Sequence, residues 1–217
     1  MDNSLQLFAI YALPILLAIT LHEAAHAYVA RYFGDSTAYL QGRMSLNPIR
    51  HIDPLGTILI PVLLYVAGSP FLFGYAKPVP INFNNLRKPK RDMAWVALAG
   101  PAANIVMAFL WMILSIVLGA MDFQGDFLLS MTQAGGLSNL VIFAFNLFPI
   151  PPLDGGRVLT SLLPDRYAYQ FARIEPYGFF IILALAYFRI LNFWMVPLMM
   201  AASMLLQLIV SPLNFLF

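Results

Sequence analysis

The residues best suited to chemistry in this sequence lie in the string His22-Glu23-Ala-Ala-His26. Histidines four positions apart lie one above the other on the same face of a helix, so both imidazoles can bind one metal ion. The glutamate between them would lie beside that metal and can accept a proton from water. The string would arise by chance with a probability on the order of 10⁻⁴ to 10⁻³. The alternative is a polar patch for helix packing, but ionisable residues inside a membrane are costly and usually functional.

A catalytic zinc ion needs a third protein ligand and an open position for water, and Asp154 is the candidate. It lies in the string NLFPIPPLDGG at Asn146–Gly156, whose prolines and glycines prevent a regular helix. Broken backbone inside a membrane is tolerated only where it is buried in protein or lines a wet cavity, so an acidic group there is placed to meet a cation. If both segments are counted as helices from Leu5 and Leu137, His22 and Asp154 each lie about 26 Å along their segments. The two side chains can therefore meet at the same depth in the membrane. The alternative is an aspartate that caps a turn or a helix.

Composition predicts an all-α polytopic membrane protein. Of the 217 residues, 61% are hydrophobic and 10% are charged, whereas a soluble domain is about half apolar and one quarter charged. The aromatic content of 14% excludes a disordered chain, and the net charge of +2 is too small for a nucleic-acid partner. The absence of cysteine excludes disulfides and thiolate metal ligands. No basic segment of the kind found in a cleaved signal peptide precedes the first apolar helix, so we expect that helix to be retained in the bilayer.

The apolar runs predict about five to six transmembrane helices in one domain, residues 1–217. Residues 177–210 would make a single helix of roughly 51 Å, too long for one span, so we expect a hairpin that turns at Arg189–Asn192. Near the cytoplasmic membrane face, we expect a short β-hairpin at 36–47 and an extended strand at 77–83, where alternate prolines forbid a helix. The expected helices are about 5–33, which carries the two histidines, 93–119, 135–150, 177–188 and 193–210.

Segment 55–74 can either span the membrane or enter and leave it on the same side. Pro61 and the Gly68-Ser69-Pro70 break supply the turn that a re-entrant segment needs. In the re-entrant arrangement, eleven of the twelve lysines and arginines fall on one side, with Arg189 as the exception. The positive-inside rule then puts the basic loops, and the active site beside them, towards the cytoplasmic side of the cell membrane. We favour this arrangement over a full span.

Three strings together resemble the site-2 proteases, a family of intramembrane zinc metalloproteases. They are HEAAH, Gly100-Pro-Ala-Ala-Asn104 in a middle span, and NLFPIPPLDGG in a later one. The resemblance implies one catalytic Zn²⁺ bound by His22, His26 and Asp154, with Glu23 as the general base. It also implies a transmembrane protein as substrate. The chain looks like a short, single-domain member without a PDZ or CBS module.

Three further polar side chains lie in or near the expected site. Asn104 is interpreted as a group that hydrogen-bonds between closely packed helices, with a direct role in the reaction as the alternative. Asn146 could hold a substrate carbonyl or an oxyanion, and packing is an equal alternative. His51, beside Asp53 in a loop, is expected to support a turn or orient a neighbouring group rather than bind the metal.

Two other classes of function compete with an endopeptidase that cleaves peptide bonds in or next to transmembrane segments. A membrane metal-binding or transport protein could use the same ligands, but such proteins usually show polar residues along a path and repeated halves. The sequence shows one cluster and no repeat. A catalytically inactive membrane adaptor would not need an intact HEAAH string or Asp154.

Overall fold

The computed structural model describes residues 3–66, 77–121 and 125–212, and these parts contain no β-strand. Four of their helices are long and apolar enough to cross a membrane: α1 (Asn3–Tyr32), α4 (Pro89–Ala120), α5 (Asp126–Asn146) and α9 (Asn192–Val210). The shorter helices are α2 (Thr37–Leu40), α3 (Ile60–Val66), α6 (Asp154–Leu162), α7 (Asp165–Ala172) and α8 (Glu175–Tyr187). The predicted all-α membrane protein is thus confirmed, with four long helices where about five to six spans were expected.

Two additional apolar segments form shorter helices within the described residues. Helix α8 has 13 residues and therefore a length of about 20 Å, against about 30 Å for the hydrocarbon core. Helix α3 has 7 residues and follows one turn of wider π-helix at Pro54–Leu59. Residues 67–76, which belong to the predicted segment 55–74, lie outside the described residues. The re-entrant arrangement of that segment therefore stays a prediction.

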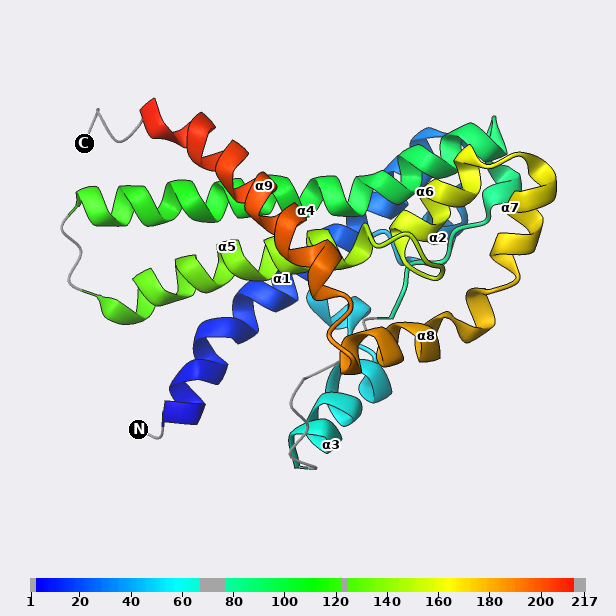
Figure 1. Ribbon diagram of the computed structural model, residues 1–217. Coiled ribbons are helices and arrows are strands. Elements are labelled where there is room, and N and C mark those ends of the chain that lie inside the picture. The colour runs from blue at the N-terminus through cyan, green and yellow to red at the C-terminus, as the bar shows by residue number, and fades with distance from the viewer. Residues whose placement is uncertain (1–2, 67–76, 122–124, 213–217) are drawn as a thin grey trace.

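Helices α4 and α5 form a long antiparallel hairpin against which α1 packs, and α9 crosses this pair (Figure 1). Small residues are buried in this bundle: Ala18 and Ala30 of α1 and Ala144 of α5 are fully buried. At Gly135 of α5, an added Cβ would lie 2.4 Å from the Trp111 ring of α4. Because lipid provides no hydrophobic drive between helices, such close backbone approach is what holds the bundle together.

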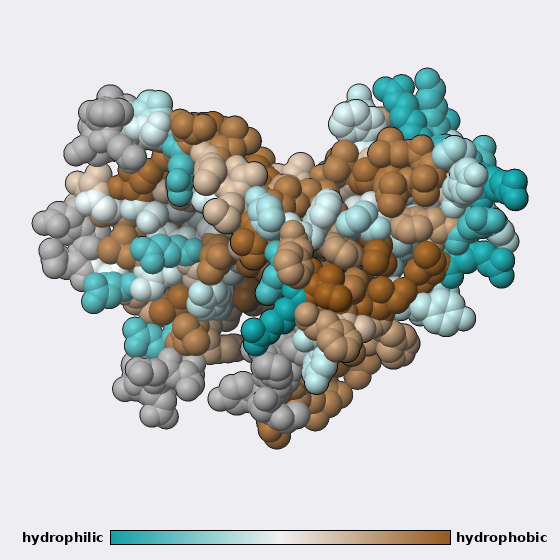
Figure 2. Space-filling view, viewed as in Figure 1, coloured by the Kyte–Doolittle hydropathy of each residue, from teal (hydrophilic) through white to brown (hydrophobic). Residues whose placement is uncertain are grey.

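The two ends of the bundle differ in polarity. Helix α1 begins and α9 ends on one side of the molecule, whereas α2, α6 and α7 lie on the other (Figure 1). Hydrophilic residues gather around α7 (Figure 2). There Lys90, at the start of α4, forms a 2.6 Å ion pair with Asp165 of α7. The α6–α7 end is therefore the polar end of the membrane-embedded bundle.

The β-hairpin predicted at 36–47 is wrong. Thr37–Leu40 form one helical turn, because Asp35 accepts hydrogen bonds from the Thr37 N–H at 3.0 Å and from its hydroxyl at 2.5 Å. Side-chain hydrogen bonds of this kind start turns in competition with strand pairing. The chain then folds back, and the N–H groups of Arg43 and Met44 both donate to the Ala38 carbonyl, at 2.8 and 3.3 Å.

The strand predicted at 77–83 is also wrong. The prolines do prevent a helix, but the remaining donors bind scattered acceptors rather than a neighbouring strand. The Lys77 N–H donates to the His51 carbonyl at 2.9 Å, and the Asn82 N–H donates to the Asp35 carboxylate at 2.8 Å. With Pro78 and Pro80 lacking an N–H, the segment has too few donors for a ladder.

Candidate metal centre

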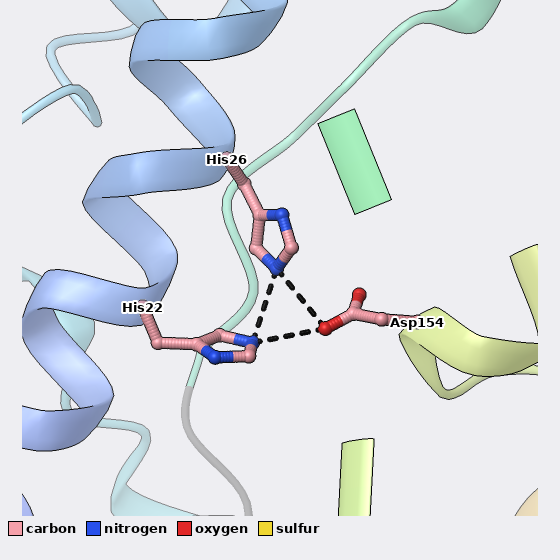
Figure 3. A group of neighbouring side chains, drawn as sticks. All are labelled: His22, His26 and Asp154. Atoms are coloured by element: carbon pink, nitrogen blue, oxygen red, sulfur yellow. Dashed lines mark hydrogen bonds and ion pairs between the residues drawn. The ribbon is translucent and has the colours of Figure 1, made fainter. Parts of the chain in front are cut away.

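Helix α1 presents both histidines of the HEAAH string on one buried face. His22 and His26 are 5% and 4% exposed, and their Nε2 atoms lie 3.0 Å apart (Figure 3). The rings meet edge to face at an interplanar angle of 85°. This is the arrangement that the i, i+4 spacing predicts, since it follows from helix periodicity alone.

Asp154 reaches the same point from the first residue of α6 (Figure 3). Its Oδ2 atom lies 3.1 Å from Nε2 of His22 and 3.3 Å from Nε2 of His26. The two glycines that follow let the preceding loop fold tightly against α6. An added Cβ would lie 2.1 Å from the Leu147 carbonyl oxygen at Gly155, and 2.2 Å from the Pro151 nitrogen at Gly156.

The donor set fits a metal ion. The second ring nitrogens face acceptors, with Nδ1 of His22 at 2.7 Å from Asn104 Oδ1 and Nδ1 of His26 at 2.7 Å from the Val96 carbonyl. Each Nδ1 must therefore carry the proton, and each Nε2 directs a lone pair at the other ligand atoms. Asp154 Oδ2 is buried and receives no hydrogen bond from the described residues. Three converging acceptors of this kind form a donor set that could hold a metal ion.

The separations also fit zinc. Tetrahedral zinc binds nitrogen and oxygen ligands at about 2.0–2.2 Å, which separates neighbouring ligand atoms by roughly 3.3–3.6 Å. The three observed separations are 3.0, 3.1 and 3.3 Å, within a few tenths of an ångström of that range. In the described parts of the chain, His22, His26 and Asp154 are the one group of three or more ligand side chains that converges in this way.

Two asparagines buried between the helices support the His22 ring. Asn104 of α4 accepts from His22 and donates its Nδ2 to the Ala18 carbonyl at 3.3 Å and to Asn139 Oδ1 at 3.0 Å. Asn139 of α5 donates in turn to the Gly135 carbonyl at 2.8 Å, and both asparagines are fully buried. The predicted helix-to-helix role of Asn104 agrees with these contacts. Asn139 was not predicted, although a second asparagine in an apolar span was a visible signal.

Gly100 of α4 was noted only as part of a motif, yet it closes one side of the centre. An added Cβ at this position would lie 2.4 Å from Nε2 of His26 and 2.5 Å from Cε1 of His22. These distances are far shorter than any van der Waals contact. Only a glycine therefore allows α4 to approach the two imidazoles this closely.

The remaining predicted residues contact other groups and do not belong to the converging group of three. Glu23 is half-buried and accepts a 2.7 Å hydrogen bond at Oε2 from the Val79 N–H. Asn146 donates to the Ile142 carbonyl of its own helix at 3.0 Å. His51 is 2% exposed, and its Nε2 lies 2.8 Å from the Ser45 carbonyl, within the loop. The loop-supporting interpretation of His51 agrees with this position.

Comparison with known proteins gives one family. A profile described as "Peptidase family M50" matches residues 120–188. The chain is 41% identical over 186 residues to "Putative zinc metalloprotease YwhC" of Bacillus subtilis, covering 83% of this chain and 81% of that protein. It is 31% identical over 179 residues to "Putative zinc metalloprotease Rip2" of Mycolicibacterium smegmatis, covering 82% and 67%. It is 25% identical over 169 residues to "Zinc metalloprotease MJ0392" of Methanocaldococcus jannaschii, covering 78% and 38%. No solved structure gives a significant match.

Proposed function

This chain belongs to peptidase family M50, the site-2 proteases, and from that premise we propose that it hydrolyses membrane-protein substrates with one zinc ion held by His22, His26 and Asp154. It is an intramembrane zinc metalloprotease, so transport and adaptor functions are set aside. The observation that carries the assignment of ligands is the convergence of three buried acceptor atoms within 3.3 Å of one another.

Glu23 is the proposed proton carrier of the reaction. When bound, zinc supplies a Lewis acid that polarises a carbonyl oxygen and makes water more acidic. Glu23 accepts a proton from the attacking water as the water oxygen bonds to the scissile carbonyl carbon. It then delivers that proton to the amide nitrogen as the C–N bond breaks. Glu23 does not ligate in this scheme, and its second oxygen stays bonded to the Val79 N–H.

The proposed substrate is a peptide bond in or next to a transmembrane segment. A helical substrate hides its carbonyls in hydrogen bonds, so it must be unwound locally before attack. Burial of the ligands supports chemistry at membrane depth, because His22, His26 and Asp154 are all at most 5% exposed. A dry site strengthens the electrostatic interactions that stabilise the developing oxyanion.

We propose that the centre opens towards the cytoplasm and that segment 55–74 is re-entrant. The support is the 2.9 Å hydrogen bond from the Lys77 N–H to the His51 carbonyl. Residues 51 and 77 flank the segment, so its two flanks lie side by side, as a re-entrant path requires. Single cysteines can test this in the cysteine-free chain. Leu40→Cys and Asn84→Cys should both react with a membrane-impermeant thiol reagent from the cytoplasmic side, and Met121→Cys from the outside. Labelling of positions 40 and 84 from opposite sides would contradict the arrangement.

The decisive experiment on function pairs zinc analysis with cleavage of a membrane substrate in reconstituted vesicles. Glu23→Gln should abolish cleavage and retain one zinc per chain, because the amide cannot take up the proton. Glu175→Gln is the matched control, since Glu175 is exposed at the start of α8. Its one ion pair within the described residues is with Arg157, at 3.9 Å. Cleavage by Glu23→Gln at the wild-type rate would refute the proposed mechanism.

A further inference from the structure

The string Pro78-Val79-Pro80 meets α1 beside the proposed general base. The Val79 N–H donates to Glu23 Oε2 at 2.7 Å. Proline has no backbone N–H, so Val79 carries the one donor of this tripeptide. That donor binds the carboxylate. A charged acceptor makes such a bond about twice as strong as one between neutral groups.

The segment that carries Val79 is anchored on both sides of the contact. Before it, the Lys77 N–H donates to the His51 carbonyl and Arg43 Nη2 donates to the Lys77 carbonyl, both at 2.9 Å. After it, Asp35 accepts at Oδ2 from the Asn82 N–H at 2.8 Å and at Oδ1 from Asn85 Nδ2 at 3.1 Å. The backbone around Val79 therefore has little freedom to move.

Asp35 is the main anchor, and the reaction scheme gives it no other role. It lies just beyond the end of α1 and is 1% exposed. Burial raises the pKa of the Asp35 carboxyl, but hydrogen bonds from Thr37, Asn82 and Asn85 outweigh burial and lower this pKa. An ionised, buried carboxylate with all these donors ties the turn after α1 to the Val79 segment.

The Val79 side chain is built into the packing of α1. It is 6% exposed and packs with Ala27 of α1 and Ala38 of α2, which are 0% and 2% exposed. Ala27 follows Glu23 by four residues, so it lies one turn further along the same face of the helix. A segment packed in this way is a permanent wall of the site rather than a plug that a substrate displaces.

We propose that the Val79 peptide N–H is a positioning group for Glu23 and that Asp35 holds the segment that presents it. The inference rests on the proposed role of Glu23 as proton carrier. With Oε2 bonded to Val79, the carboxylate keeps one orientation and Oε1 stays available to water. Without that bond, Glu23 samples several rotamers, and misplacement of a reacting group by about 1 Å can cost roughly 100-fold in rate.

The sharpest test replaces the Val79 peptide bond by an ester, through incorporation of 2-hydroxyisovaleric acid at position 79 in the full chain. The ester removes the N–H and keeps the side chain. We expect kcat to fall about 10- to 100-fold, with KM within about twofold of wild type and one zinc per chain retained. The control keeps the N–H of Val79: it is an ester at Ile81, whose N–H bonds to no described residue. This variant should keep kcat near the wild-type value.

A second measurement follows the hydrogen bond directly. In zinc-loaded protein labelled with ¹⁵N-valine, exchange of the Val79 amide with deuterium should be at least about tenfold faster in Glu23→Ala than in wild type, because the acceptor is gone. An unchanged kcat for the ester at position 79, an increased kcat, or unchanged amide exchange would each overturn the inference. Such a result together with an inactive Glu23→Gln leaves the proposed function standing. An active Glu23→Gln instead refutes the proposed function itself.

Discussion

The candidate metal centre and helix α8 both lie in apolar stretches of the sequence, but their side chains are held in different ways. At the centre, Asn104 and Asn139 are fully buried, and each side-chain polar atom of these two asparagines has a hydrogen-bond partner. On α8, Tyr177, Phe180 and Tyr187 are 67%, 67% and 66% exposed. The side chains at the centre are held by specific hydrogen bonds, whereas those on α8 need only be apolar.

The physical reason is that lipid acts as solvent for one region and not for the other. Lipid tails are as apolar as leucine, so an exposed aromatic side chain on a membrane helix costs little. A buried polar group finds no water there and must be paired inside the protein. Substitutions at the centre should therefore have large and specific effects, whereas those on the exposed surface of α8 should have small ones.

The largest effect is expected for Asp154→Ala. The change removes one of the three proposed ligands, so zinc content after dialysis against a chelator should fall from one per chain to near zero, and cleavage should be lost. Atomic absorption measures the zinc content, and a cleavage assay measures the activity. His51→Gln is the control and should retain zinc, because His51 contacts its own loop. Stoichiometric zinc in Asp154→Ala would show that another residue is the third ligand.

A large effect is also expected for Gly100→Ala, although the change adds only a methyl group. The new Cβ would lie 2.4 Å from Nε2 of His26, so the imidazoles must move out of register with Asp154. We expect zinc affinity to fall at least about tenfold and the rate at least about 100-fold. Gly136→Ala is matched, since a Cβ there meets no atom within 4 Å. Normal zinc affinity in Gly100→Ala would show that α4 can move away from the site.

An intermediate effect is expected for Asn104→Leu. Leucine keeps the branching and the number of side-chain heavy atoms but removes the acceptor of His22 Nδ1, so the ring loses both its preferred tautomer and its orientation. Zinc affinity should fall about 10- to 100-fold, measured by competition with a chromogenic chelator. Gln133→Leu on exposed α5 surface should leave the affinity unchanged. Equal affinities for the two variants would mean that the asparagine pair only packs the helices.

The smallest effect is expected for Phe180→Ala on α8. The side chain is 67% exposed, and a bilayer contacts it as readily as protein does. The midpoint of thermal unfolding and the cleavage rate in vesicles should both stay close to wild type, the rate within about twofold. A loss comparable to that of Asn104→Leu would place α8 in the working site and remove the contrast between the two regions.

Local periodicity and composition were enough for much of this protein. The membrane class follows from the apolar runs, and the facing imidazoles of His22 and His26 follow from the pitch of one helix. Both depend on residues close in the chain, so they need no knowledge of the fold. Asp154 could be proposed as a partner because an acid in broken membrane backbone has few other uses.

Local patterns failed where other groups bind the backbone donors that a strand would need, from a neighbouring residue in one case and from distant segments in the other. Residues 36–47 form no strand because the Thr37 N–H bonds to the Asp35 carboxylate. Residues 77–83 form none because their backbone N–H groups bond to the His51 carbonyl and to the carboxylates of Glu23 and Asp35. Helix α6 starts at Asp154 although two glycines follow this residue. Because the glycines have no Cβ atoms, the loop that precedes α6 can pack directly against the helix.

Only the tertiary structure decided what surrounds the ligands. The buried partners of the site come from four separate segments: Val96, Gly100 and Asn104 on α4, Asn139 on α5, Asp35 after α1, and Val79 in the loop. No periodicity connects them, since His22 and Asn104 alone are separated by 82 positions. Helix pitch places neighbours along one element, whereas the pairing of buried polar groups depends on which elements pack together. That choice is made by the whole bundle.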